Sequence, residues 1–134
     1  ALIAGGVLEY LYAHEGAQAV QAMLAQMGAK LGGDAAERIA AARDSAEVTR
    51  LLAEQLDTLG YEAQVVDASG HPEVEAWNCV FHSLARTHPD VCRFDLAFMS
   101  AATGHPVQRT QCMLHGAPAC RFHVGRPDEK KPAS

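Results

Sequence analysis

Apolar side chains in the first sixty residues recur every three or four positions, the spacing of one face of an α-helix. This spacing predicts a helix over residues 17–31 that ends at Gly32-Gly33, preceded by a helix over about 2–12 that Gly16 interrupts. Residues 34–43 are alanine-rich and also predict a helix. The apolar side chains expected in the core from the 17–31 helix are Val20, Met23, Leu24, Met27 and Leu31.

A further helix is predicted over residues 45–59, because its apolar residues again lie on one face. Asp44 precedes it, and Glu47 follows three residues later, which is typical of a capped helix start. Gly60 predicts its end.

From Tyr61 the pattern changes to the two-residue alternation of β-strands. In this part of the chain we expect two strands, then two helices separated at His88-Pro89, and then two final strands. Their predicted ranges are 61–68, 73–79, 80–88, 90–103, 107–114 and 119–124, with Gly104 ending the second helix. The polar residues 125–134 predict a disordered tail. We therefore expect one α+β domain over residues 1–124, in which several N-terminal helices pack on a small antiparallel sheet that ends in a β-hairpin.

Composition agrees with one globular domain. The chain has 134 residues, of which 49% are hydrophobic and 20% charged, and its formal net charge is −5. An acidic chain without a basic patch is not expected to bind nucleic acid directly. We expect no membrane span, because no apolar run is as long as the ~20 residues that a spanning helix needs.

The cysteines are the residues of this sequence that are most able to bind a ligand. The segment "NCVFHSLARTHPDVC" contains Cys79, His82, His88 and Cys92, and Cys112 and Cys120 lie near the end of the chain. Cys79 and His82 are separated by about one helical turn, so they would face the same side of a helix. Thiolate and imidazole are both zinc ligands, so this pair of residues could bind a metal ion. His88, which precedes a proline, is expected to be a helix-end residue instead.

Two other interpretations of the cysteines remain open from spacing alone. Free cysteine is usually a small buried hydrophobe, and four cysteines could also form two disulfides. We favour reduced thiols that bind a ligand, because a chain this apolar does not need disulfides for stability. Catalysis is not expected: Asp95 and the scattered glutamates form no recognisable acid–base pair, and no glycine-rich phosphate loop is present.

Residues 77–124 resemble the C-terminal sensor domain of bacterial helix-turn-helix transcriptional regulators, a group that includes the repressors of iron–sulfur cluster assembly. The end of this segment is also similar to the end of the vinyl-reductase-like small-molecule-binding domains. The matching positions are Asn78-Cys79, Phe81-His82, Ala85, His88-Pro89, Val91-Cys92, Cys112, Gly116 and Cys120-Arg121-Phe122.

The resemblance implies an α+β fold, a separate N-terminal helix-turn-helix that binds DNA, and an iron–sulfur cluster held by cysteines. Its implied metal ligands are Cys79, Cys92, Cys112 and Cys120, with His82 as a possible replacement for one of them. Zinc in a mixed cysteine and histidine site is the other expected cofactor. The spacing from Cys79 to Cys92 fits the family, and the later spacings fit it less well.

Two further functions remain open. The domain could bind an apolar small molecule in a pocket between helices and sheet, with the cysteines only structural. That pocket would be lined by Trp77, Phe81, Phe94, Phe98 and Met99. It could also be a dimerisation module without a ligand. In each case we expect a cytoplasmic protein, and a homodimer.

Overall fold

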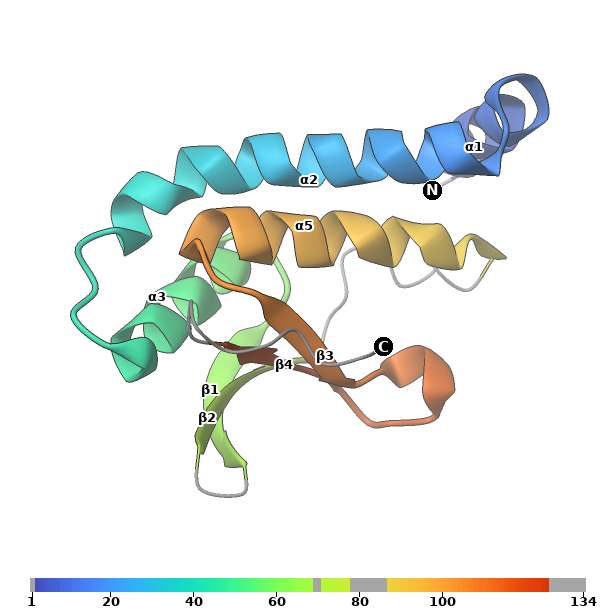
Figure 1. The fold of residues 1–134 in the computed structure, drawn as a ribbon. Coiled ribbons are helices and arrows are strands. Elements are labelled where there is room, and N and C mark those ends of the chain that lie inside the picture. The colour runs from blue at the N-terminus through green and yellow to red at the C-terminus, as the bar shows by residue number, and fades with distance from the viewer. Residues whose placement is uncertain (1, 69–70, 78–86, 126–134) are drawn as a thin grey trace.

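The computed structural model describes residues 2–68, 71–77 and 87–125, and within these ranges it has an α+β architecture (Figure 1). The predicted fold class is confirmed, because helices precede an antiparallel sheet whose last two strands form a hairpin, and α3 packs directly on β1 and β2. In chain order the elements are α1 (Leu2–Glu15), α2 (Ala17–Ile39), α3 (Ser45–Thr58), β1 (Ala63–Ala68), β2 (His71–Ala76), η1 (Pro89–Val91), α5 (Cys92–Thr103), β3 (Val107–Gln111), η2 (Met113–His115) and β4 (Cys120–Val124).

The described strands form one sheet in the order β1-β2-β4-β3, and every neighbouring pair is antiparallel. The last strand of the chain therefore lies between β2 and β3, with Val74 opposite Phe122 and Ala76 opposite Cys120. This pairing joins the two halves of the sequence. It also brings the start of β4 beside the end of β2, where the candidate site lies.

Helix α2 continues through Gly32-Gly33 to Ile39, so the predicted break at these glycines is wrong. Gly28 and Gly32 instead lie against α5, which runs beside α2 in the same direction (Figure 1). A Cβ at Gly28 would collide with the backbone of Phe94, and one at Gly32 with the backbone of Phe98. The glycines are required for the close approach of two helices, not for a turn.

This close approach also changes which face of α2 is buried. Val20 and Leu24 are buried as expected, whereas Met27 and Leu31 are each 50% exposed. The buried positions continue instead through Gly28, Gly32, Ala35 and Ile39. Small residues replace large ones along the contact because the backbones leave no room for a side chain.

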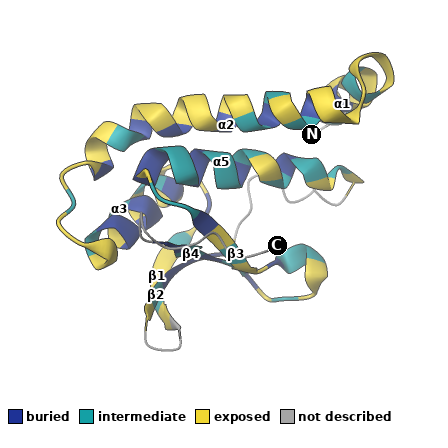
Figure 2. Ribbon diagram, in the orientation of Figure 1, coloured by how far each residue is buried: buried dark blue, intermediate teal, exposed yellow. Residues whose placement is uncertain are grey.

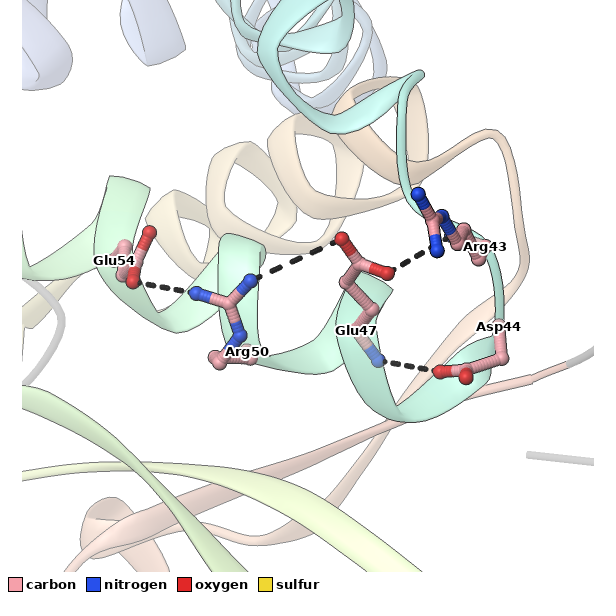
Figure 3. A network of polar contacts seen from close by, with 5 residues as sticks. All are labelled: Arg43, Asp44, Glu47, Arg50 and Glu54. Atoms are coloured by element: carbon pink, nitrogen blue, oxygen red, sulfur yellow. Dashed lines mark hydrogen bonds and ion pairs between the residues drawn. The ribbon is translucent and has the colours of Figure 1, made fainter.

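Helix α3 begins where the sequence predicts (Figure 3). The backbone N–H of Glu47 donates to Asp44 Oδ1 at 2.9 Å, and Glu47 Oε2 accepts from the backbone N–H of Arg43 at 3.1 Å. Arg50 then pairs with Glu54 at 2.9 Å and with Glu47 at 3.9 Å. The cap is confirmed, and it satisfies backbone donors that would otherwise lack partners.

The main core lies between α3, α5 and the sheet (Figure 2). Leu52 of α3, Met99 of α5 and Val74 of β2 are fully buried there. A second, smaller cluster joins α1, α2 and η1 through Leu8, Val20, Leu24 and Val91. None of the helices in the described ranges is long and apolar enough to cross a membrane.

The predicted ends of several elements need correction. Strand β2 begins at His71 and ends at Ala76, earlier than the predicted 73–79, and β3 ends at Gln111 rather than at residue 114. The backbone N–H of Gly125 donates to Pro106 at 2.7 Å, so order extends one residue into the predicted tail. Residues 126–134 and nearly all of the helix predicted over 80–88 lie outside the described residues.

Candidate functional site

Cysteines from three separate elements line one hollow at the end of the sheet. Cys92 is the first residue of α5, Cys112 lies between β3 and η2, and Cys120 is the first residue of β4. The space between its lining residues is about 400 Å³ including the part open to solvent, of which only about 20 Å³ is wide enough for a water molecule. Its other lining residues are Tyr61, Ala76, Asp95, Arg109, Met113, Leu114 and Phe122.

Cys112 lies beside Cys120 because the chain turns sooner than its alternation predicts. The pairing of β3 with β4 is irregular between Arg109 and Gln111, and Cys112 then starts the short turn η2. Its carbonyl oxygen accepts from the backbone N–H groups of His115 at 3.0 Å and Ala117 at 3.3 Å. The expectation that Cys112 is in mid-strand is thus wrong, and the turn directs it to the hollow.

The described thiols are free, with Cys112 buried and Cys92 and Cys120 partly buried. Burial raises the pKa of Cys92, and Arg109 opposes that shift by its charge and by donating a hydrogen bond. Burial likewise raises the pKa of Cys120, whose Sγ accepts from the backbone N–H of Met113 at 3.3 Å. Cys112, 7% exposed, contributes electrostatically to both shifts. The thiols of Cys92 and Cys120 therefore hold their protons more tightly than an exposed cysteine does, and a metal would have to displace those protons.

Asp95 is the acidic residue of this hollow, and the sequence did not single it out as part of a site. It lies one turn after Cys92 on α5 and is 6% exposed. Burial raises its pKa from 3.8 to about 6, although the hydroxyl of Tyr61 donates to Asp95 Oδ1 at 2.6 Å. The spacing of three residues from Cys92 was the available signal, since such residues share a helix face.

Replacing Asp95 by asparagine is expected to stabilise the reduced, metal-free protein near neutral pH. The raised pKa means that the folded state binds the proton more tightly, so the contribution of Asp95 to stability is full below pH 3.8 and lost as the pH rises through about 6. A shift of this size corresponds to at most about 3 kcal/mol. Denaturant unfolding at pH 5 and pH 8 should show a smaller loss of stability in Asp95→Asn than in the wild type.

The control for this prediction is Asp34→Asn, which neutralises an exposed carboxylate on α2. It should leave the pH dependence as in the wild type. If the free energy of unfolding changes with pH equally in Asp95→Asn and in the wild type, then burial does not raise the pKa of Asp95.

The other predicted ligands are not in the described part of this hollow. Cys79, His82 and Phe81 lie outside the described residues. His88 precedes η1, and its ring stacks on Tyr12 with centroids 5.6 Å apart. Its position agrees with its interpretation as an element-end residue.

The donor set suits a metal that prefers thiolates, and the three described thiols are not all within 4.8 Å of one another. In zinc sites the Zn–S bond is about 2.3 Å, so tetrahedral geometry brings the sulfurs to roughly 3.8 Å of one another. Within the described ranges, one group of three or more ligand-type residues has all its donor atoms within 4.8 Å, namely His71, Glu73 and His123, and it contains none of the cysteines. An iron–sulfur cluster is larger than one ion and is held by cysteine thiolates.

A second hollow is relevant to the expected pocket for an apolar small molecule. It lies between α2, α3 and α5 rather than between helices and sheet, has a volume of about 830 Å³ including open solvent, and has Phe94 and Phe98 among its lining residues. Tyr61 lines both this hollow and the cysteine hollow. Of the other predicted lining residues, Met99 is fully buried in the core and Trp77 is 43% exposed, and neither lines this hollow.

Comparison with known proteins gives no family assignment, since no protein-family model matches the chain and no curated protein is significantly similar to it.

Proposed function

We propose that this chain is the sensory domain of a bacterial transcriptional regulator, and that it binds an iron–sulfur cluster through its cysteines. The observation that carries the proposal is the convergence of Cys92, Cys112 and Cys120 on one hollow from α5, the β3–η2 junction and β4. Cys92 precedes Cys112 by 20 residues, and Cys120 follows Cys112 by 8 across a short turn. Structural cysteines have no need to gather in this way, whereas cluster ligands do.

The charges around the hollow support a thiolate-bound centre. Several thiolates carry more negative charge than a ferric or ferrous centre neutralises, and a nearby cation lowers that cost. Arg109 lies in the hollow and lowers the pKa of both Cys92 and Cys120 against the larger effect of burial. The backbone N–H that Met113 donates to Cys120 Sγ is the kind of bond that tunes a cluster's reduction potential.

We propose Cys79 as the fourth ligand, with His82 as the alternative, on the evidence of the sequence. Ala76 lines the hollow, and Cys79 follows it by three positions. Three residues of chain span at most about 11 Å, so the connectivity permits Cys79 to join the other three cysteines.

The described contacts also support a relay from the cysteines to the N-terminal helices. Asp90 precedes Cys92 by two positions and accepts from the Tyr12 hydroxyl of α1 at 2.7 Å and from Gln21 Nε2 of α2 at 3.3 Å. Helix α5 begins at Cys92 and packs closely along α2. A cluster that holds Cys92 would therefore bias the arrangement of α1 and α2, through which a DNA-binding domain would respond.

The partners of this domain follow from the same proposal. Ile3, Val7 and Tyr10 of α1 are 83%, 52% and 62% exposed, which supports a role of α1 in a homodimer. DNA would be bound only by a separate helix-turn-helix, since this chain has a formal net charge of −5. Free thiols support a reducing, cytoplasmic location, and the domain would bind a ligand rather than catalyse a reaction.

A second candidate function is supported by the hollow between α2, α3 and α5. Phe94 and Phe98 line it, and Leu31 and Leu59, at 50% and 51% exposure, form part of its wall. An apolar effector would bind here while the cysteines serve only the structure. Asp34 and Arg38 are the charged residues among those that line this hollow.

The deciding experiment is elemental analysis with an absorption spectrum on protein purified without oxygen. Iron and acid-labile sulfide in equal amounts, with visible absorbance that dithionite bleaches, are the expected result. Zinc without sulfide would mean that the cysteines bind a zinc ion and not an iron–sulfur cluster. Neither metal, together with a co-purifying organic molecule, would favour the apolar effector instead.

A further inference from the structure

A second group of ligand-type side chains lies on the opposite face of the sheet from the cysteines. Along β4, His123 alternates with Phe122 and so faces away from the side of Cys120 and Phe122. Along β2, His71 and Glu73 are two positions apart and share a face. The antiparallel register that pairs Val74 with Phe122 places Glu73 next to His123 across the two strands.

The contacts within this group are close. The donor atoms of His71, Glu73 and His123 all lie within 4.8 Å of one another. His71 Nε2 lies 3.2 Å from Glu73 Oε2, and the rings of His71 and His123 meet edge to face with centroids 4.7 Å apart. Glu73 is only 5% exposed.

The second carboxylate oxygen of Glu73 is held by a hydrogen bond from the neighbouring part of the sheet. Thr110 of β3 donates its hydroxyl to Glu73 Oε1 at 2.9 Å, which leaves Oε2 directed to the histidine side. Metal-bound carboxylates are commonly held by such a hydrogen bond from a residue that does not itself bind the metal. Burying a carboxylate is costly, and a cation between Glu73 and the two imidazoles would offset that cost.

Space for further ligands is present beside the group. His71, Glu73, Thr110 and His123 line a hollow of about 1,330 Å³, including open solvent, that extends to the start of α3 at Ser45. Two imidazoles and one carboxylate with an open side are a donor set used by zinc and by other divalent transition metals. Metal–nitrogen bonds of about 2.0–2.1 Å require the donors to close slightly, which the half-exposed His71 can do by rotation.

We propose that His71, Glu73 and His123 form a binding site for a divalent transition metal ion such as Zn²⁺, with water completing the coordination. The site is independent of the cysteines and of the cluster proposed there. No local spacing in the sequence relates His71 and Glu73 to His123, because the strand pairing that joins β2 to β4 brings them together across about fifty residues of chain.

The test is an anaerobic titration of the purified chain with Co²⁺, a spectroscopic substitute for Zn²⁺. Cobalt bound by imidazole and carboxylate gives visible bands without the thiolate-to-cobalt charge-transfer band, so the two sites are distinguished in one spectrum. We expect about one equivalent to bind without that band. His71→Ala and His123→Ala should each weaken this binding at least about tenfold, and Thr110→Val should weaken it less.

His14→Ala is the matched control, because it removes an exposed histidine on α1 and should leave the affinity unchanged. Unfolding curves for each variant show whether it is folded, and the exposed position of His71 makes that variant the safer test. Cobalt bands that all carry thiolate charge transfer, or unchanged affinity in both folded histidine variants, would overturn the proposal. Those outcomes would leave the cysteine proposal intact.

Discussion

Cys112→Ser is expected to lose essentially all iron and sulfide from the anaerobically purified protein. Cys112 is the most buried of the described cysteines, at 7% exposure, and it lies close enough to Cys92 and Cys120 to influence the pKa of both thiols. A serine hydroxyl is nearly the same size but is a poor ligand for a cluster that prefers soft thiolate. Iron, sulfide and visible absorbance per chain are the quantities to compare with the wild type.

Met113→Leu is the matched control for this substitution. Met113 lines the same hollow, and its backbone N–H, which donates to Cys120 Sγ, is present in the variant as well. This variant should retain its iron, because only a side chain that is not a proposed ligand has changed. Wild-type iron content in Cys112→Ser, Cys92→Ser and Cys120→Ser alike would contradict the proposed ligand set.

Gly28→Ala and Gly32→Ala are expected to be the most destabilising of all single methyl additions to α2. The new Cβ would meet backbone atoms of α5, at Phe94 and Phe98 respectively, and a backbone cannot rotate away as a side chain can. Overpacking of a tight contact typically costs about 1–3 kcal/mol, and a collision with backbone belongs at the upper end of this range. The free energy of unfolding from denaturant curves is the measurement.

Gly33→Ala provides the control, since a Cβ there has nothing within 4 Å. Alanine is favoured over glycine inside a helix by about 1 kcal/mol, so this variant should be more stable than the wild type. Opposite signs for neighbouring residues of one helix would establish the glycine contact between α2 and α5. Stabilisation in all three variants would mean that the two helices do not pack this closely.

The same variants bear on the proposed relay. Phe94, whose backbone meets Gly28, lies two positions after Cys92 on α5. A shift of α2 along α5 would therefore displace the start of α5 and the cysteine hollow with it. A folded Gly28→Ala variant with less iron than Gly33→Ala would be evidence that the helix contact and the cysteine site are coupled.

Local sequence signals predicted the elements that depend on a few neighbouring residues. Asp44 and Glu47 predicted the start of α3, and Gly104, with φ 71°, ends α5 in the left-handed conformation as expected. Cys92 and Cys120 also begin α5 and β4, near the positions that the sequence indicated. Helix caps are encoded locally, because a side chain and the backbone of the same turn form the contact.

The incorrect predictions share a different physical origin. Gly32-Gly33 was interpreted as a helix end from its intrinsic preference, but packing against α5 outweighs that preference of about 1 kcal/mol per glycine. Cys112 was expected in mid-strand because alternation does not show where a pairing irregularity ends a strand. Neither outcome depends on residues nearby in the sequence.

The sequence by itself determined the α+β fold class and the order of the described strands, and it indicated cysteines as the residues most able to bind a ligand. Only the tertiary structure brought Asp95 and Arg109 beside three of those cysteines, and His71 and Glu73 beside His123. Periodicity reports which face of an element is apolar, and it contains no information on which elements become neighbours. That choice was made by the pairing of β4 with β2 and by the close contact of α2 with α5.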